Sequence, residues 1–349
     1  MHMADALLAP AVAATMYVAS GTAAGISISK LKKDDEASKL PIMAVTSALV
    51  FAGQMINYTI PGTGSSGHMC GGMLLSALLG PYAGFLSMIV ILAIQCLFFA
   101  DGGLMALGAN CWNMAFYGCF VGYFLIWRPI MNSNWFGTDK KAQRLRIIAA
   151  SIIGCVVTLQ LGAFSVVIET SLSGITELPF GAFLALMQPI HLAIGLVEGL
   201  ITSAVLVFVF ESRPELLQDV EVSEGESKSS LKTVVAILAV IALVVGGGLS
   251  LLASSNPDGL EWALFGNAEE GYAENMGLDE DDFGIESGAA DAAGSIQEKT
   301  SFLPDYAFPD SEAAIGTTVS GIAGSAIVAG VAVLICVAGG FFRKKQKKV

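Results

Sequence analysis

Long apolar runs separated by short polar stretches make up most of this 349-residue chain. Nine of these runs read as membrane segments, at residues 6–28, 41–58, 69–79, 82–100, 110–127, 147–168, 181–210, 233–252 and 317–342. A helix needs about 20 apolar residues to cross a hydrocarbon core of about 30 Å. The pattern therefore predicts an all-α polytopic integral membrane protein.

One long apolar run, residues 69–100, divides into two segments. As a single helix it would be about 48 Å long, which exceeds the hydrocarbon core. Gly80-Pro81 supplies the break, because proline lacks an N–H donor and clashes with the preceding turn. The first half is short and follows a glycine-rich loop. Short membrane segments interrupted by Gly and Pro are typical of a binding site at membrane depth.

Basic residues place the polar stretches relative to the membrane. They gather at 30–39, 128–146, 213–232 and 343–348, and the positive-inside rule assigns all four clusters to the cytoplasm. Nine segments satisfy this only if the N-terminus lies outside and the C-terminus inside a cell membrane. The first basic residue is Lys30, so little holds the N-terminus in the cytoplasm.

The composition also indicates an integral membrane protein. Only 14% of the residues are charged and the mean hydropathy is +0.68, whereas soluble domains carry about 25% charged residues. The net charge of −12 is concentrated, because 15 of the 30 acidic residues lie between Asp258 and Glu312, with Lys299 as the one basic residue there. The protein is expected to be surrounded by membrane lipid, and a basic patch for nucleic acid is absent.

These patterns divide the chain into three parts. Residues 1–212 form a core of seven segments, and residues 213–231 form a polar cytoplasmic linker. Residues 232–349 form a two-helix hairpin whose outer loop is acidic. Within that loop, residues 266–300 are rich in Gly, Ala, Ser and acidic residues, so we expect this stretch to be flexible.

The N-terminus carries candidate metal-binding chemistry. His2 is too large for removal of the initiator methionine, so Met1 is expected to remain. The Met1 amine, the deprotonated backbone nitrogen of His2 and its Nδ1 can then close two chelate rings around one ion. His68, on the same outer side, is the candidate fourth ligand. Four nitrogens in a plane favour Ni²⁺, Cu²⁺ or Co²⁺ over Zn²⁺, which prefers tetrahedral sites.

Other polar residues lie in or beside the apolar segments. His191 and Glu198 are seven residues apart and share a helix face. Together with Asn57 and Ser66, they are candidates for supporting the ligands through hydrogen bonds, although a structural role between helices is an open alternative. Asp101, at the end of a segment, reads as a solvated cap. Because imidazoles must be neutral to bind metal, loading is expected to fail below a pH of about 6.5.

Several motifs resemble the CbiM/NikM family, the substrate-specific membrane components of energy-coupling-factor cobalt/nickel importers. The resemblance covers about residues 1–212 and rests on motifs such as Met1–Asp5, Pro61–His68 and Gln188–Gly195. It implies that Met1, His2 and His68 hold Ni²⁺ or Co²⁺ as the transported substrate, with ATP hydrolysis by ABC-type ATPase subunits and a transmembrane coupling (T) component as partners. Pro257-Asp258-Gly259-Leu260-Glu261 resembles the PDGLE domain, which is related to the small N subunits of these systems.

Three other functions fit the sequence less well. They are a metal-sensing membrane receptor, a capture subunit for an organic nutrient with the same architecture, and a membrane metalloenzyme. An enzyme needs an open coordination position, which the planar set lacks; the chain is therefore expected to be non-catalytic. The acidic outer loop is expected to attract cations through its field, without taking part in coordination.

Overall fold

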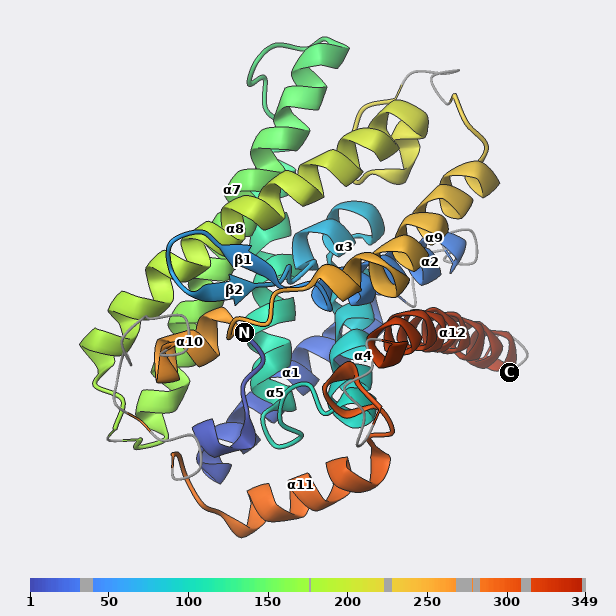
Figure 1. Cartoon of the computed structure of the whole chain (residues 1–349). Coiled ribbons are helices and arrows are strands. Elements are labelled where there is room, and N and C mark those ends of the chain that lie inside the picture. Colours follow the sequence, from blue (N-terminus) through green and yellow to red (C-terminus); the bar gives the residue numbers. More distant parts are fainter. Residues whose placement is uncertain are drawn as a thin grey trace.

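The structure of the protein is a computed structural model (Figure 1). It describes residues 1–31, 40–175, 177–222, 228–267, 278, 283–308 and 315–346, the last helix with side chains as far as residue 334. Some residues of the predicted basic clusters, among them Lys32, Lys33 and Lys39, lie outside the described residues.

Helices dominate the fold, as the apolar pattern predicts. The long and short helices of the core are α1 (Pro10–Leu31), α2 (Leu40–Gln54), α3 (Gly72–Leu79), α4 (Pro81–Phe99), α5 (Leu107–Asn110), the π-helical segment η3 (Cys111–Trp127), α6 (Arg128–Met131), α7 (Lys140–Leu172) and α8 (Phe180–Ser212). The C-terminal part contributes α9 (Leu231–Gly247), α10 (Gly259–Phe265), α11 (Gly288–Thr300) and α12 (Ile315–Gln346). Two short strands, β1 (Tyr58–Ile60) and β2 (Ser65–Gly67), form an antiparallel hairpin.

Seven helical stretches in the described part of the chain are long and apolar enough to cross a membrane. Five belong to the core and two to the C-terminal part. The prediction of an all-α polytopic membrane protein is confirmed, with α2 and α3 as shorter apolar helices.

Two boundaries differ from the prediction. The segment expected at 41–58 ends as a helix at Gln54, because residues 58–60 pair as β1 with β2. Part of the stretch expected to be flexible, 266–300, is helical. In α11, Ser287 accepts a hydrogen bond from the backbone of Ala290 and caps an alanine-rich run.

The break at Gly80-Pro81 is confirmed. Gly80 has a φ of 84° and separates α3 from α4, in which Pro81 is the first residue. Helix α3 is buried along its whole length. It therefore ends inside the protein, and its N-terminal side leads directly to the loop that carries His68.

Long helices pack around this inserted segment (Figure 1). Helices α7 and α8 run side by side, and η3 packs against α7 and α3. Helices α9 and α12 of the C-terminal part pack against α2. The N-terminus lies near the middle of the molecule, close to α10 and the strand hairpin, so three distant parts of the sequence meet there.

Gly118 of η3 tests how closely α3 must approach its neighbours. A Cβ atom at Gly118 would lie 2.8 Å from the Cα of Gly72. We expect Gly118→Ala to lower the free energy of unfolding by about 1–3 kcal/mol, because two backbones would have to separate. Gly21→Ala is the matched control, since nothing lies within 4 Å of a Cβ there. Equal thermal unfolding of the two variants in detergent would contradict this close approach.

Candidate metal centre

His68 follows a strand hairpin whose loop contains two left-handed glycines. Gly62 and Gly64 have φ values of 77° and 70°, a conformation that side chains other than glycine rarely adopt. In the hairpin, Tyr58 lies opposite Gly67 and Ile60 opposite Ser65. The chain then turns through His68 into α3, which leaves the backbone N–H groups at this turn in need of partners.

Glu198 of α8 supplies those partners. Its two carboxylate oxygens accept hydrogen bonds from the backbone N–H groups of Cys70, at 2.7 Å, and Gly71, at 2.9 Å. Glu198 is 1% exposed, so these bonds are made away from water. The carboxylate thereby fixes the turn that carries His68.

The ring of His68 has a defined tautomer. Its Nδ1 lies 3.1 Å from the carbonyl oxygen of Met69, which can only accept a hydrogen bond. Nδ1 therefore carries the proton, and the lone pair is on Nε2. That nitrogen lies 3.2 Å from the N-terminal nitrogen of Met1, with both groups buried. A ligand-competent nitrogen of His68 is thus directed at the N-terminus.

The residues after the N-terminal dipeptide are held in place by Asn110. Its side-chain oxygen accepts from the N–H of Met3 at 2.7 Å, and its side-chain nitrogen donates to the Met3 carbonyl oxygen at 3.2 Å. The N–H of Gly103 donates to the same carbonyl at 2.9 Å. Met3 is fully buried, so the chain enters the site along one fixed path.

His2 lies beside His68 and faces a carboxylate. The two imidazole rings stack with centroids 5.1 Å apart. Nδ1 of His2 lies 3.1 Å from Asp101, while its buried Nε2 has no hydrogen-bond partner among the described residues. The chelate predicted from the sequence uses Nδ1, so in this arrangement that nitrogen must exchange Asp101 for the ion.

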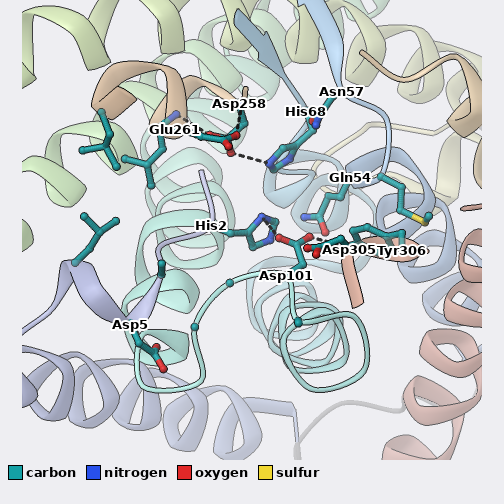
Figure 2. A pocket seen from close by; sticks show the side chains of 18 of the residues that line it. His2, Asp5, Gln54, Asn57, His68, Asp101, Asp258, Glu261, Asp305 and Tyr306 are labelled. Carbon is teal, nitrogen blue, oxygen red and sulfur yellow. Dashed lines mark hydrogen bonds and ion pairs between the residues drawn. The ribbon is translucent and has the colours of Figure 1, made fainter. Parts of the chain in front are cut away.

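Two residues of the C-terminal part, Asp258 and Tyr306, contact residues of the candidate site. Asp258 places one carboxylate oxygen 2.6 Å from the Met1 nitrogen and 3.9 Å from Nε2 of His68. Tyr306 donates a hydrogen bond of 2.5 Å to Asp101. Figure 2 shows His2, His68, Asp101 and Asp258 converging from these separate elements. The expectation that the acidic loop attracts cations through its field, without taking part in coordination, stays a prediction, but one residue of that loop lies next to the Met1 nitrogen.

Asp101 and Asp258 are the site residues that sequence reasoning missed. Asp101 is not the solvated cap expected, because its side chain is 23% exposed and pairs with His2 and Tyr306. Asp258 belongs to the PDGLE motif, for which the sequence pattern predicted no contact with the N-terminus. Nothing in the local pattern signals that its second oxygen faces the N-terminus.

The predicted supporting residues have different positions. Glu198 fixes the His68 turn. Asn57 and Ser66 instead contact the C-terminal part: the carbonyl oxygen of Asn57 accepts from Ser254, and the Ser66 hydroxyl donates to the carbonyl of Asn256. His191 donates from Nδ1 to the Met187 carbonyl of its own helix, at 2.8 Å. A Cβ atom at Gly259 would lie 3.2 Å from its ring, so His191 packs against the PDGLE motif.

A cavity of about 610 Å³ adjoins the two histidines. Carboxylates line much of it, from Asp5, Asp101, Asp258, Glu261 and Asp305 (Figure 2). Such a lining attracts cations and repels anions. The cavity thus places an acidic lining beside His2 and His68.

Burial sets the protonation of the two imidazoles. It is the main cause that lowers the pKa of His68 to about 3, and the positive N-terminus adds to the effect. Burial also lowers the pKa of His2, partly offset by Asp101. Burial therefore favours the neutral form of both rings, and the expectation that loading fails below a pH of about 6.5 stays a prediction. Burial alone would raise the pKa of Asp258, but the N-terminal charge and His68 lower it overall.

The donor set is chemically unusual. Among the residues that the structure describes, no group of three or more His, Cys, Asp and Glu side chains could hold a metal ion. The nitrogens that do converge come from an N-terminus and two imidazoles. Such a set suits Ni²⁺, Co²⁺ or Cu²⁺, and the hard ions Mg²⁺ and Ca²⁺ prefer all-oxygen sites.

Family comparison identifies the chain. The family described as the cobalt uptake substrate-specific transmembrane region, CbiM, matches residues 2–216. The chain belongs to the CbiM family. The PDGLE domain matches residues 232–339, so the chain is a CbiM domain fused to a PDGLE domain.

Individual relatives agree with this assignment. A fused NikMN protein of Archaeoglobus fulgidus is 34% identical over 330 residues, which cover 94% of this chain and 95% of the relative. A cobalt transport protein CbiM of Sorangium cellulosum is 29% identical over 64% of this chain and 96% of its own length. The crystal structure of a truncated transition metal transporter is 31% identical, with a TM-score of 0.52 over 60% of this chain and 99% of that one. This CbiM-family chain is a multi-pass membrane component of metal transport.

Glu198 provides a test of how the His68 turn is fixed. We expect Glu198→Gln to lower the free energy of unfolding by about 1–3 kcal/mol, because an amide NH₂ would face a backbone N–H that needs an acceptor. Metal affinity should fall as well, since the turn carrying His68 loosens. Glu211→Gln, near the end of the same helix and paired with Lys140, is the matched control. Unchanged metal affinity in the Glu198 variant, measured by equilibrium dialysis, would show that the turn holds His68 without this carboxylate.

Proposed function

We propose that this CbiM-family protein is the substrate-binding membrane subunit of an ATP-driven uptake transporter for Ni²⁺ or Co²⁺. The observation that supports it most is the 3.2 Å approach of His68 Nε2 to the Met1 nitrogen, beside the stacked ring of His2. Relatives named for nickel and cobalt transport agree with that ion class.

In this proposal, the Met1 amine, the backbone nitrogen and Nδ1 of His2, and Nε2 of His68 surround the ion in one plane. The amine must lose a proton, the amide must lose another, and Nδ1 must leave Asp101. Asp101 and Asp258 then remain beside the ion as negative charges, which offset the cost of placing a divalent cation in a buried site.

Transport requires partners outside this chain. The sequence carries no Walker A motif, so ATP hydrolysis is assigned to ABC-type ATPase subunits, coupled through a transmembrane T component. The basic clusters favour an N-terminus outside and a C-terminus in the cytoplasm of the cell membrane. The site, which adjoins the N-terminus, would then receive the ion at the outer face.

The proposal is tested with purified protein and with cells. Elemental analysis should find one Ni²⁺ or Co²⁺ per chain, and a planar four-nitrogen Ni²⁺ centre should be diamagnetic. Uptake in cells should require the coupling and ATPase subunits. Binding without uptake, even with those subunits present, would favour a metal-sensing receptor. Absence of metal together with a bound organic compound would favour a nutrient-capture subunit.

The N-terminal amine gives the sharpest mutational prediction. Inserting one alanine between Met1 and His2 enlarges the chelate ring while both histidines remain. We expect Ni²⁺ affinity to fall by at least about 100-fold, comparable to the loss in His68→Ala. The control is the same insertion after the exposed residue Ile28, near the C-terminal end of α1. Parental affinity in the Met1–His2 insertion would rule out the chelate, provided mass spectrometry shows Met1 is retained.

Protons provide a second prediction. Because burial favours the neutral form of both imidazoles, we expect Ni²⁺ binding near pH 7 to release about two protons, from the amine and the amide. Affinity should fall as the pH drops, since protons compete for these two groups and not for the imidazoles. Titration calorimetry in buffers of different ionisation enthalpy measures the number. Release of about four protons would mean that both imidazoles are charged before the ion arrives.

A further inference from the structure

Asp258 occupies a position that connects the PDGLE domain directly to the proposed ligands. Its side chain has two separate tasks, one for each oxygen. Oδ1 accepts from the backbone N–H groups of Leu260, at 2.8 Å, and Glu261, at 2.9 Å, and so caps α10. Oδ2 is left to face the Met1 nitrogen at 2.6 Å. The helix cap therefore orients the carboxylate toward the N-terminus.

The segment before Asp258 is fastened to the strand hairpin that carries His68. The N–H of Ser66 donates to the carbonyl of Pro257 at 2.8 Å, and the Ser66 hydroxyl donates to the carbonyl of Asn256 at 2.7 Å. The N–H of Ser254 donates to the carbonyl of Asn57 at 2.7 Å. The hairpin and the PDGLE segment thus form one unit, with Asp258 at a fixed distance from His68.

Gly259, the residue after Asp258, packs against α8. A Cβ atom at Gly259 would lie 3.1–3.2 Å from the side chains of Ile190, His191 and Ile194 on α8. A side chain at this position would force those neighbours to shift by a few tenths of an ångström, so glycine helps α10 to lie close to α8. The position of Asp258 is therefore set from both the hairpin and α8.

The Met1 amine lies at the end of the chain, beyond the Met3 backbone that Asn110 holds. Chain ends are mobile unless contacts hold them. Among the described residues, the Met1 nitrogen has two polar partners, His68 and Asp258, and the Met1 side chain is 4% exposed. His68 is the group that the ion itself would bind. Asp258 is thus the contact that can hold the amine in place independently of the ion.

We propose that Asp258 is a positioning residue of the metal centre, which holds the Met1 amine beside His68 while the site is empty and so speeds capture of the ion. The inference rests on the proposed function for the role of the amine as a ligand. The arriving ion takes over the amine, and the carboxylate stays beside it as a negative neighbour. The PDGLE domain then contributes part of the site, in addition to any general attraction of cations.

The test compares two single carboxylate removals in the full-length chain. Asp258→Asn keeps an oxygen to cap α10, since asparagine is a good N-cap residue, so folding should be preserved. Asp291→Asn removes the same charge from an exposed position of α11 in the same acidic part of the chain. Ni²⁺ association is followed by stopped-flow fluorescence, and affinity by equilibrium dialysis, at low salt and at about 1 M salt.

We expect Asp258→Asn to slow association about 10-fold or more at both salt concentrations, within the 10–100-fold range typical of residues that support metal ligands. Asp291→Asn should slow it about twofold or less at low salt and not at all at high salt, because screening removes a long-range field. Equal effects of the two variants would overturn the positioning role. Faster association in Asp258→Asn would also overturn it, since the carboxylate would then be an obstacle to the ion.

A direct measurement of the amine completes the test. In the metal-free protein, the Met1 α-amine should react with an acylating reagent several-fold faster in Asp258→Asn than in Asp291→Asn, as measured by peptide mass spectrometry. Equal rates would count against the proposal. The variant His68→Ala separates the role of Asp258 from the proposed function. If His68→Ala retained its Ni²⁺ affinity, the proposed metal site would be refuted. If His68→Ala lost affinity and Asp258→Asn had no effect, only the role of Asp258 would be refuted.

Discussion

The bond between Glu198 and the turn before α3 is the interaction on which the site depends most. A short helix that begins inside a membrane protein exposes backbone N–H groups where water is scarce, and each unsatisfied group costs free energy. The Glu198 carboxylate accepts from two of them, at Cys70 and Gly71. With that turn fixed, the Met69 carbonyl sets the tautomer of His68 and directs its Nε2 to the N-terminus.

Three segments that are far apart in the sequence build the centre around this fixed point. The N-terminal residues enter along a path set by Asn110, the strand hairpin presents His68, and the PDGLE segment presents Asp258. Tyr306 adds a contact through Asp101 to His2. The PDGLE domain is therefore integrated with the CbiM domain at the level of single hydrogen bonds.

The sequence allowed several features to be predicted because they depend on local chemistry. The break at Gly80-Pro81 follows from proline geometry, and the apolar runs follow from the thickness of the membrane. His2 and His68 stood out because the chain has three histidines in all. The end of α2 at Gln54 was missed, since residues 55–58 are apolar enough to continue a helix and only pairing between β1 and β2 stops them.

What the sequence determined by itself is the membrane class, the family and the types of donor available, because hydropathy, motif residues and ligand chemistry are properties of single residues. The tertiary structure decided which groups face one another. In the sequence, Asp258 is one acidic residue of the PDGLE motif, and Asp101 reads as a solvated segment end. Their carboxylate oxygens meet Met1, Tyr306 and His2 only because chain segments that are 99 to 257 residues apart pack together. Such contacts depend on the relative positions of whole helices, which no local pattern encodes.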